Sequence, residues 1–182
     1  MCDITNINEA RTEYQRRASQ IHSPAHARRT AATNARFLLP HLRPGMRLLD
    51  AGCGPGSITI GLAEAVAPGE VTGIDASDEA IASARRRAAE AGCAKMRFDV
   101  ADVYGLPFED GTFDAAFMHA VLQHLDDPVR GLREVRRVLK PGGVVGVADA
   151  DHDGTIIFPD DPMLHRSFDV LARLRAQTAG DV

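Results

Sequence analysis

A glycine-rich turn is the first place in this sequence where a ligand could bind. Met46 to Leu49 form a short apolar run, the turn Gly52-Cys53-Gly54-Pro55-Gly56 follows, and an apolar-periodic helix starts near Ser57. A strand, a glycine turn and a helix in this order place bare backbone N–H groups and a helix N-terminus at the carboxyl edge of a sheet. Asp50 adds a negative charge where a dinucleotide would place its pyrophosphate. The turn therefore favours a ligand that has a positive group and no phosphate.

A second carboxylate, Asp75, ends the next apolar segment, about 20 residues beyond the glycine turn. An ionised carboxylate offers only acceptors, so Asp75 could bind both hydroxyls of a ribose. The alternative is a capping acid for the helix that begins at Ser77. The spacing favours ribose binding.

Two histidines, His119 and His124, flank the segment after the fourth expected strand. Either could act as a general base, although a single histidine is more often a packed or capping residue. Cys53 could act as a nucleophile only with a paired base, and none adjoins it in the sequence. We therefore interpret Cys53 as a small residue that fits the turn.

An acid-rich cluster follows the fifth expected strand and contains Asp149, Asp151, His152 and Asp153. Carboxylate and imidazole groups could hold a metal. The alternative, a wall on the substrate side of the sheet, is the interpretation we favour.

The segment Leu48 to Gly56, LLDAGCGPG, closely resembles the first motif of class I S-adenosylmethionine-dependent methyltransferases. Further segments resemble the later motifs of the small-molecule branch related to ubiquinone/menaquinone methyltransferases: IDAS (74–77), Asp102 with LPF (106–108), FD (113–114), VLQHLDDP (121–128) and REVRRVLKPGG (133–143). The likeness covers about residues 35 to 150 in family order and spacing.

The resemblance implies S-adenosylmethionine as cofactor, S-adenosylhomocysteine as product, and a small-molecule acceptor methylated at oxygen, carbon or nitrogen. It implies that Asp102 accepts from the adenine amine and that the Val103 N–H donates to the ring. Tyr14 belongs to a segment that forms a lid in the family, and its ring could face the sulfonium. His124 would organise the loop over the methionine moiety. The residues expected at the cofactor are Tyr14, Asp50, Gly52, Cys53, Gly54, Gly56, Ser57, Asp75, Ala76, Ser77, Ala101, Asp102, Val103, Met118, His119 and His124.

No catalytic residue is assigned. Methyl transfer from a sulfonium mainly requires that the acceptor be positioned. An acceptor that must lose a proton would need a base. His119 and His124 are then the candidates.

The elements that must position these residues alternate along the chain. Such alternation implies a doubly wound parallel α/β sheet of the Rossmann-like type, with helices on both faces. The family likeness implies the strand order 3-2-1-4-5. Expected strands cover residues 46–49, 70–75, 95–100, 112–119 and 144–148, and expected helices cover 24–39, 57–67, 78–91, 128–140 and 160–177.

We expect residues 1–42 to form a helical lid and residues 43–182 to form the cofactor-binding core. The family continues beyond the last helix into strands 6 and 7, which this sequence lacks. The fifth strand would then be an apolar edge with unpaired backbone groups, which natural proteins avoid. We expect either a truncated form, which we favour, or an edge covered by a partner copy in a homodimer.

Length and composition fit one soluble domain: 182 residues, 45% of them hydrophobic and 25% charged. The formal net charge of −4 gives no case for nucleic acid as the main partner. We interpret the arginine runs 85–87 and 136–137 as solvated helix faces. Three cysteines without metal spacing and the lack of a long apolar run predict a cytoplasmic protein with reduced thiols, no metal and no membrane span.

Two other functions remain open. An NAD-dependent dehydrogenase shares the opening half of the fold, but its G-x-G-x-x-G fingerprint would need Gly or Ala at Ser57. The other is a binding or scaffolding domain that keeps the cofactor pocket but does not turn over.

Overall fold

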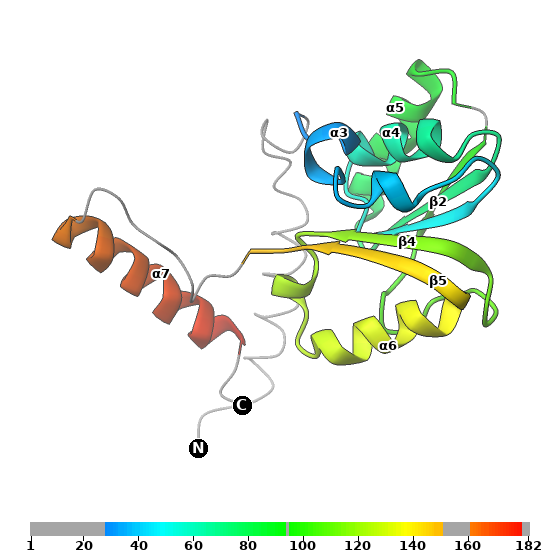
Figure 1. The fold of residues 1–182 in the computed structure, drawn as a ribbon. Coiled ribbons are helices and arrows are strands. Elements are labelled where there is room, and N and C mark those ends of the chain that lie inside the picture. Colours follow the sequence, from blue (N-terminus) through cyan, green and yellow to red (C-terminus); the bar gives the residue numbers. More distant parts are fainter. Residues whose placement is uncertain (1–27, 94, 151–160, 180–182) are drawn as a thin grey trace. The chain divides into compact units, whose positions relative to one another are not determined.

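A computed structural model of the chain describes residues 28–93, 95–150 and 161–179 (Figure 1). Among these, the residues up to Asp149 belong to one compact unit, and Ala150 belongs with helix α7 (Pro162–Ala179) to a second. Each unit is described by itself. No helix in the described part of the chain is long and apolar enough to cross a membrane.

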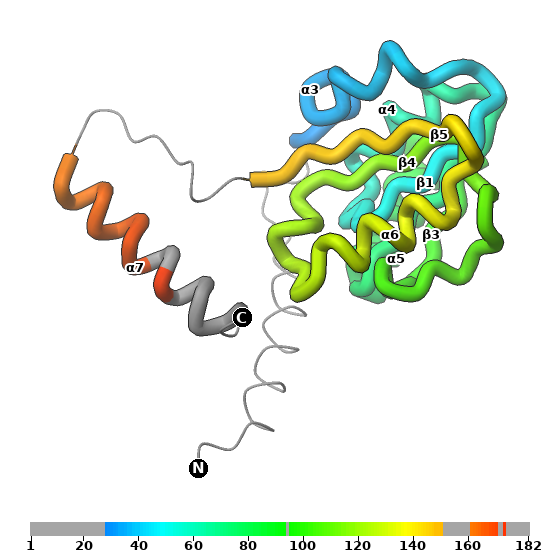
Figure 2. The backbone as a smooth tube through the Cα atoms, turned by 60° about the horizontal axis from the view of Figure 1, so that its bottom comes forward, coloured from blue at the N-terminus to red at the C-terminus, as the bar shows by residue number. Residues whose placement is uncertain are grey.

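The first unit is built on a five-stranded sheet in which every neighbouring pair is parallel. The strand order is β3-β2-β1-β4-β5, as the family likeness predicted. The tube view in Figure 2 shows the strands side by side. Their bounds are Arg47–Ala51 (β1), Glu70–Asp75 (β2), Met96–Val100 (β3), Phe113–His119 (β4) and Leu139–Ala148 (β5).

Helices cover both faces of this sheet, as expected (Figure 1). One face carries the short helix α3 (Ala31–Asn34), α4 (Ser57–Val66) and α5 (Asp78–Glu90). The other carries α6 (Pro128–Val138). Helix α3 packs tightly on α4 at Gly61, which leaves no room for a larger side chain: a Cβ there would lie 2.7 Å from the Ala31 methyl. The chain is therefore a three-layer α/β domain, and the Rossmann-like prediction is confirmed.

The core has two main apolar layers, separated by the sheet. The layer under α3 and α4 contains Ala35, Leu38, Leu48, Leu62, Val66 and Phe117. The layer under α6 contains Leu49, Ile74, Phe113, Met118, Val135 and Val138. Because side chains alternate along a strand, β1 and β4 contribute to both layers.

The helix starts follow the capping residues in the sequence. The Ser77 hydroxyl accepts from the Ala80 N–H at 3.2 Å, and the Asp127 carboxylate accepts from the Arg130 N–H at 2.9 Å. Pro128 occupies the first position of α6, where a missing N–H costs nothing. These caps fix where α5 and α6 begin, and therefore where the loops at the carboxyl edge end.

Two predicted elements differ in extent. β5 begins at Leu139 rather than at residue 144, because Leu139 pairs with Phe113 ahead of a bulge; Lys140 to Gly143 lie between this pair and the next one, Ala115 with Val144. The helix expected over 24–39 is confined, within the described residues, to α3, and a 3-10 turn follows at Leu39–His41. Pro40 lacks the N–H that a continuing helix would need.

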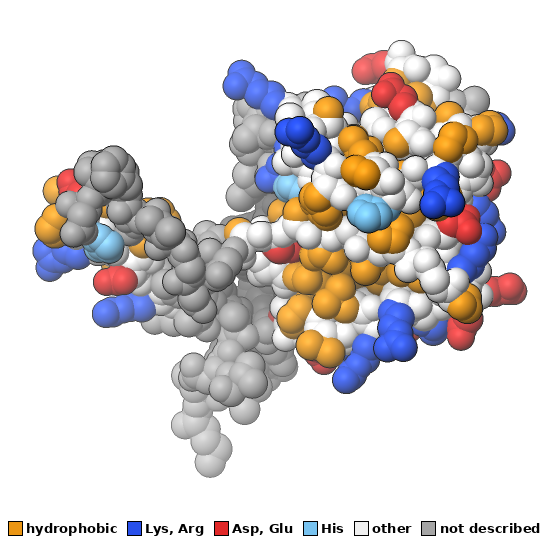
Figure 3. Space-filling view, viewed as in Figure 1, with side chains coloured by type: hydrophobic (Ala, Val, Ile, Leu, Met, Phe, Trp, Pro, Cys, Tyr) orange, Lys and Arg blue, Asp and Glu red, His pale blue; other side chains and the backbone are white. Residues whose placement is uncertain are grey.

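β5 forms one edge of the described sheet. Figure 3 shows apolar side chains gathered between β5 and α6. Leu132, Leu139, Pro141 and Val145 line a groove there, and Val145 is 42% exposed. The expectation of an apolar edge strand agrees with this arrangement.

Candidate functional site

The candidate site lies at the carboxyl edge where β1 is flanked by β2 and β4. The strand order reverses at β1: the connection after β1 leads to β2 on one side, and β4 lies on the other side. Such a reversal leaves a crevice above the carboxyl ends of the strands. Three residues expected at the ligand, Asp50, Asp75 and His119, lie at or next to the ends of β1, β2 and β4. The topology therefore brings them together from positions far apart in the sequence.

The glycine turn follows β1 in a left-handed conformation. Gly52 has φ +78°, and a Cβ there would lie 2.3 Å from Cγ2 of Val121. Gly52 is thus required both by its backbone angle and by the approach of the segment after β4. A Cβ at Gly54, with φ +52°, would meet nothing within 4 Å. The outer surface of the turn is bare backbone that a ligand could approach.

Asp75 binds the turn through its carboxylate. Its Oδ2 accepts from the Gly54 N–H at 2.9 Å, and its Oδ1 accepts from the Ser77 N–H at 2.9 Å. The side chain therefore supports the start of α5, as the capping alternative held, and also holds the glycine turn. Each carboxylate oxygen can accept more than one hydrogen bond, so these two contacts do not by themselves exclude ribose hydroxyls. Ala76, between Asp75 and Ser77, is exposed at the same edge.

Asp50 lies under the turn rather than on its surface. It is 2% exposed, and its Oδ2 accepts from the Thr59 hydroxyl at 2.6 Å. Burial raises the pKa of the Asp50 carboxyl to about 7, the Thr59 hydrogen bond opposes this, and the Asp75 charge adds to it. The charge expected at this position therefore depends on pH.

Cys53 is a packing residue in this structure. It is buried in a cluster with Ile81, Ala84 and Phe98. Burial, with the negative charges of Asp50 and Asp75, raises the pKa of the thiol well above its usual value. A thiol that stays protonated is a poor nucleophile, which agrees with the interpretation of Cys53 as a residue that fits the turn.

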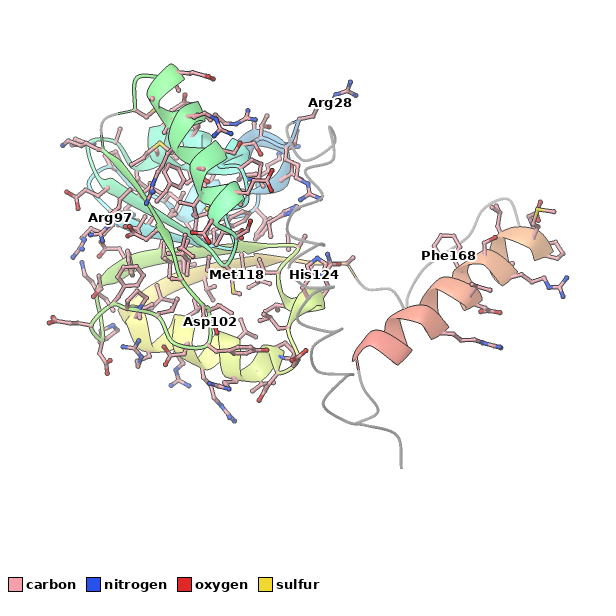
Figure 4. All side chains as sticks on the ribbon, turned by 180° about the vertical axis from the view of Figure 1, so that it is seen from behind. Arg28, Arg97, Asp102, Met118, His124 and Phe168 are labelled. Atoms are coloured by element: carbon pink, nitrogen blue, oxygen red, sulfur yellow. The ribbon has the colours of Figure 1, made fainter. Side chains whose placement is uncertain are left out.

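The loop after β3 carries Ala101, Asp102 and Val103. Oδ1 of Asp102 accepts from the Tyr104 N–H at 2.9 Å, and the side chain is exposed, so Oδ2 is accessible. Val103 and Leu106 are buried in the layer under α6 and anchor the loop. Figure 4 labels Asp102 together with Met118 and His124.

A clamp on α6 holds this loop in place. The guanidinium of Arg137 donates to the carbonyls of Leu106 at 2.9 Å and Phe108 at 2.8 Å. Glu134 accepts from the Leu106 N–H at 3.1 Å and pairs with Arg137 at 2.9 Å. Our interpretation of 136–137 as a solvated face is wrong for Arg137, whose side chain is only 31% exposed. The i,i+3 spacing of Glu134 and Arg137 was the available signal.

His119 and Met118 end β4 on opposite faces. Met118 is fully buried in the layer under α6, so it packs in the core instead of facing the crevice. His119 is half-buried, and its Nε2 lies 3.1 Å from Nδ2 of Asn34 on α3. Burial and the charge of Arg29 lower the pKa of His119, while Asp149 opposes the shift. No pattern in the sequence singles out Asn34.

Asp149 follows β5 and caps the 3-10 turn Leu122–His124. Its carboxylate accepts from the N–H groups of Val121 at 2.9 Å and Leu122 at 2.8 Å. This contact fixes the segment after β4, which includes His124. The side chain of His124 is exposed, and its Nε2 lies 3.1 Å from Nε2 of Gln123.

Several expected site residues lie outside the described residues: Tyr14 of the lid, and Asp151, His152 and Asp153 of the acid-rich cluster. Within the part of the chain that the structure describes, no group of three or more His, Cys, Asp or Glu side chains could hold a metal ion.

The residues present fit a sulfonium nucleoside better than a dinucleotide. The turn offers a surface without side chains at Gly54. Two carboxylates, Asp75 and Asp102, stand at neighbouring strand ends where a sugar and a base would each need acceptors. The buried acid Asp50 lies beneath the turn, and its ionised form disfavours a pyrophosphate there.

Comparisons with known proteins point the same way. A family model described as a methyltransferase domain matches residues 42–178. An uncharacterized methyltransferase of Schizosaccharomyces pombe is 39% identical over 140 residues, covering 74% of this chain and 50% of that protein. A demethylmenaquinone methyltransferase of Staphylococcus aureus is 41% identical over 105 residues, covering 57% of this chain and 43% of that protein. The chain thus spans half or less of these curated relatives.

Solved structures give the same fold. The geranyl diphosphate C-methyltransferase of Streptomyces coelicolor, solved with S-adenosylhomocysteine, has a TM-score of 0.58 and 28% identity, covering 64% of this chain and 44% of that one. A [4+2]-cyclase, SpnF, has a TM-score of 0.59 and 38% identity, covering 66% and 47%.

Proposed function

Because the chain belongs to the methyltransferase-domain family of class I S-adenosylmethionine-dependent enzymes, we propose that it transfers the cofactor's methyl group to a small-molecule acceptor. The observation that carries the proposal is the carboxylate of Asp75, held between the glycine turn and the start of α5. This places an acceptor pair beside a bare backbone surface at the switch point of the sheet.

We assign the parts of the cofactor to separate groups of residues. Asp75 accepts from the ribose hydroxyls, and the glycine turn lies along the amino-acid side. The accessible Oδ2 of Asp102 accepts from the adenine amine, and the Val103 N–H donates to the ring. The Glu134–Arg137 clamp keeps this loop at the distance the base requires.

The protein's task in the reaction is to position the acceptor and exclude water. When bound, S-adenosylmethionine supplies a methyl group on a sulfonium whose leaving group is neutral. Residues that hold the acceptor in line with that methyl group supply most of the rate enhancement. We propose that residues 1–42, including Tyr14, form a lid that excludes water, that residues 43–182 form the core, and that the protein works in the cytoplasm.

The comparisons indicate the chemical class of the methyl acceptor and not its identity. Two relatives are named as a demethylmenaquinone methyltransferase and a geranyl diphosphate C-methyltransferase. Both acceptors are small molecules, and we propose the same class here, methylated at oxygen, carbon or nitrogen.

A second function has one specific observation in its favour. SpnF, at 38% identity, is titled a [4+2]-cyclase. A chain with this pocket could therefore bind the cofactor without transferring its methyl group.

Calorimetry followed by a turnover assay separates these functions. We expect S-adenosylhomocysteine and S-adenosylmethionine to bind and NADH not to bind. NADH binding without binding of either sulfonium-site ligand would refute the proposal. Binding without methyl transfer to any acceptor would favour the second function.

A matched pair of variants tests the site itself. Asp102→Asn replaces an acceptor with a donor facing the adenine amine, so the affinity for S-adenosylhomocysteine should fall about 10- to 100-fold. Glu109→Gln removes a charge from the same loop, and the Glu109 side chain makes no hydrogen bond or ion pair with the described residues. It should bind as the parent chain does.

A further inference from the structure

The hydrogen bond between Asn34 and His119 joins α3 to the end of β4. It spans 85 positions in the sequence and measures 3.1 Å from Nδ2 to Nε2. The side-chain amide could in principle present either its oxygen or its nitrogen to the ring. Which atom it presents decides where the imidazole proton lies.

The contacts on the other side of the Asn34 amide settle its orientation. The Thr30 backbone N–H lies 3.3 Å from Oδ1, and the Thr33 hydroxyl lies 2.7 Å from the same atom. A backbone N–H can only donate, so the atom facing it must be the amide oxygen. The NH₂ group therefore faces Nε2 of His119.

An NH₂ group can only donate, so Nε2 must offer its lone pair and carry no proton. The remaining ring proton then lies on Nδ1, which is buried and has no hydrogen-bond partner among the described residues. The charged groups that act on the ring are Arg29, which disfavours a cationic imidazole, and Asp149, which favours one. The ring also lies 6.2 Å from that of Phe117, centroid to centroid.

We propose that Asn34 fixes His119 as the neutral tautomer with its proton on Nδ1, so that the lone pair of Nε2 is occupied by the Asn34 amide and His119 does not take a proton from a bound ligand. Asn34 is a positioning residue in this arrangement. Only the role of His119 toward a ligand rests on the proposed function; the tautomer is a property of the chain itself.

Nitrogen-15 NMR of the imidazole rings tests this inference without any ligand or turnover. In the parent chain at a pH where His119 is neutral, we expect its proton on Nδ1 and a bare Nε2. In Asn34→Asp, a carboxylate that only accepts replaces the amide. We then expect the proton to move to Nε2 and the pKa of His119 to rise.

Two comparisons guard against a merely structural effect. Asn34→Ala removes the partner altogether and should leave a mixture of the two tautomers. His124, whose Nε2 faces Gln123 instead, should keep its spectrum in every variant. A proton on Nε2 in the parent chain, or an unchanged His119 pattern in folded Asn34→Asp, would overturn the inference. Calorimetry with S-adenosylhomocysteine reports separately on the proposed function.

Discussion

Replacing Asp50 by Asn should change how the stability of this protein depends on pH. Asp50 is 2% exposed, with a pKa raised to about 7 by burial. Between about pH 4 and pH 7 the native state therefore holds a proton that the unfolded chain releases. The stability of the parent chain must fall as the pH rises through this range, and Asp50→Asn removes this contribution.

The magnitude follows from the two pKa values. A pKa raised from 3.8 to about 7 corresponds to about 4 kcal/mol of unfolding free energy, because one pKa unit is about 1.4 kcal/mol. Part of this loss has already occurred by pH 5. Between pH 5 and pH 8 the remaining change is about 3 kcal/mol.

Urea denaturation of both proteins at pH 5 and pH 8 measures this change. The difference in unfolding free energy, Asp50→Asn minus parent, should increase by about 3 kcal/mol from the lower to the higher pH. The other titrating groups are shared by the two proteins, so their contributions cancel in this difference except for the coupling of Asp75 to the Asp50 charge.

A constant difference across this pH range would refute the reasoning. Thr59→Val supplies an independent check, because the Thr59 hydroxyl donates to the carboxylate and lowers its pKa. Without that hydroxyl the pKa of Asp50 should rise further, so the loss of stability should extend to higher pH.

Three further substitutions have defined outcomes. Gly52→Ala forces an alanine into a left-handed conformation and brings its Cβ to 2.3 Å from Cγ2 of Val121. Urea denaturation should therefore show that the free energy of unfolding falls by at least about 2 kcal/mol. Adding Val121→Ala should restore part of it, and no recovery would contradict the clash. Arg137→Met releases the loop after β3, so calorimetry should show that S-adenosylhomocysteine binds at least about 10-fold more weakly. The variant should also discriminate poorly between S-adenosylhomocysteine and S-inosylhomocysteine. The exposed neighbour, changed as Arg136→Met, should retain both properties, and equal effects would argue against the clamp. Asp149→Ala removes the oxygen that accepts from both amides after β4 and should cost about 1 kcal/mol in the same denaturation assay; an unchanged midpoint would contradict that contact.

Much of the fold could be predicted because the local signals agree with it. Ser77 and Asp127 are side chains that cap helices, and both do so here. The early start of β5 could not be predicted, because Pro141 and the glycines after it are typical of a turn. Gly142 does turn, with φ +80°, and the early start depends on the single pair of Leu139 with Phe113, which is a tertiary contact.

The candidate site was predictable where a backbone conformation requires a residue type. Gly52, with φ +78°, is such a position. The role of Asp75 was expected from its spacing beyond the glycine turn. The burial of the Met118 side chain could not be predicted, because strand alternation decides its face and the sequence does not show which face meets the crevice. Asn34 was missed because a polar residue on a short helix is common, and its partner lies 85 positions away.

The double contact of Asp75 has a consequence for ligand affinity. The turn is already held by its own carboxylate, so binding need not freeze a mobile loop, and little ordering entropy opposes association. For the same reason, a weaker affinity of Asp75→Ala would be ambiguous. The substitution would loosen the glycine turn and remove a contact with the ligand at the same time. Asp102, whose exposed oxygen supports no other element, reports recognition alone.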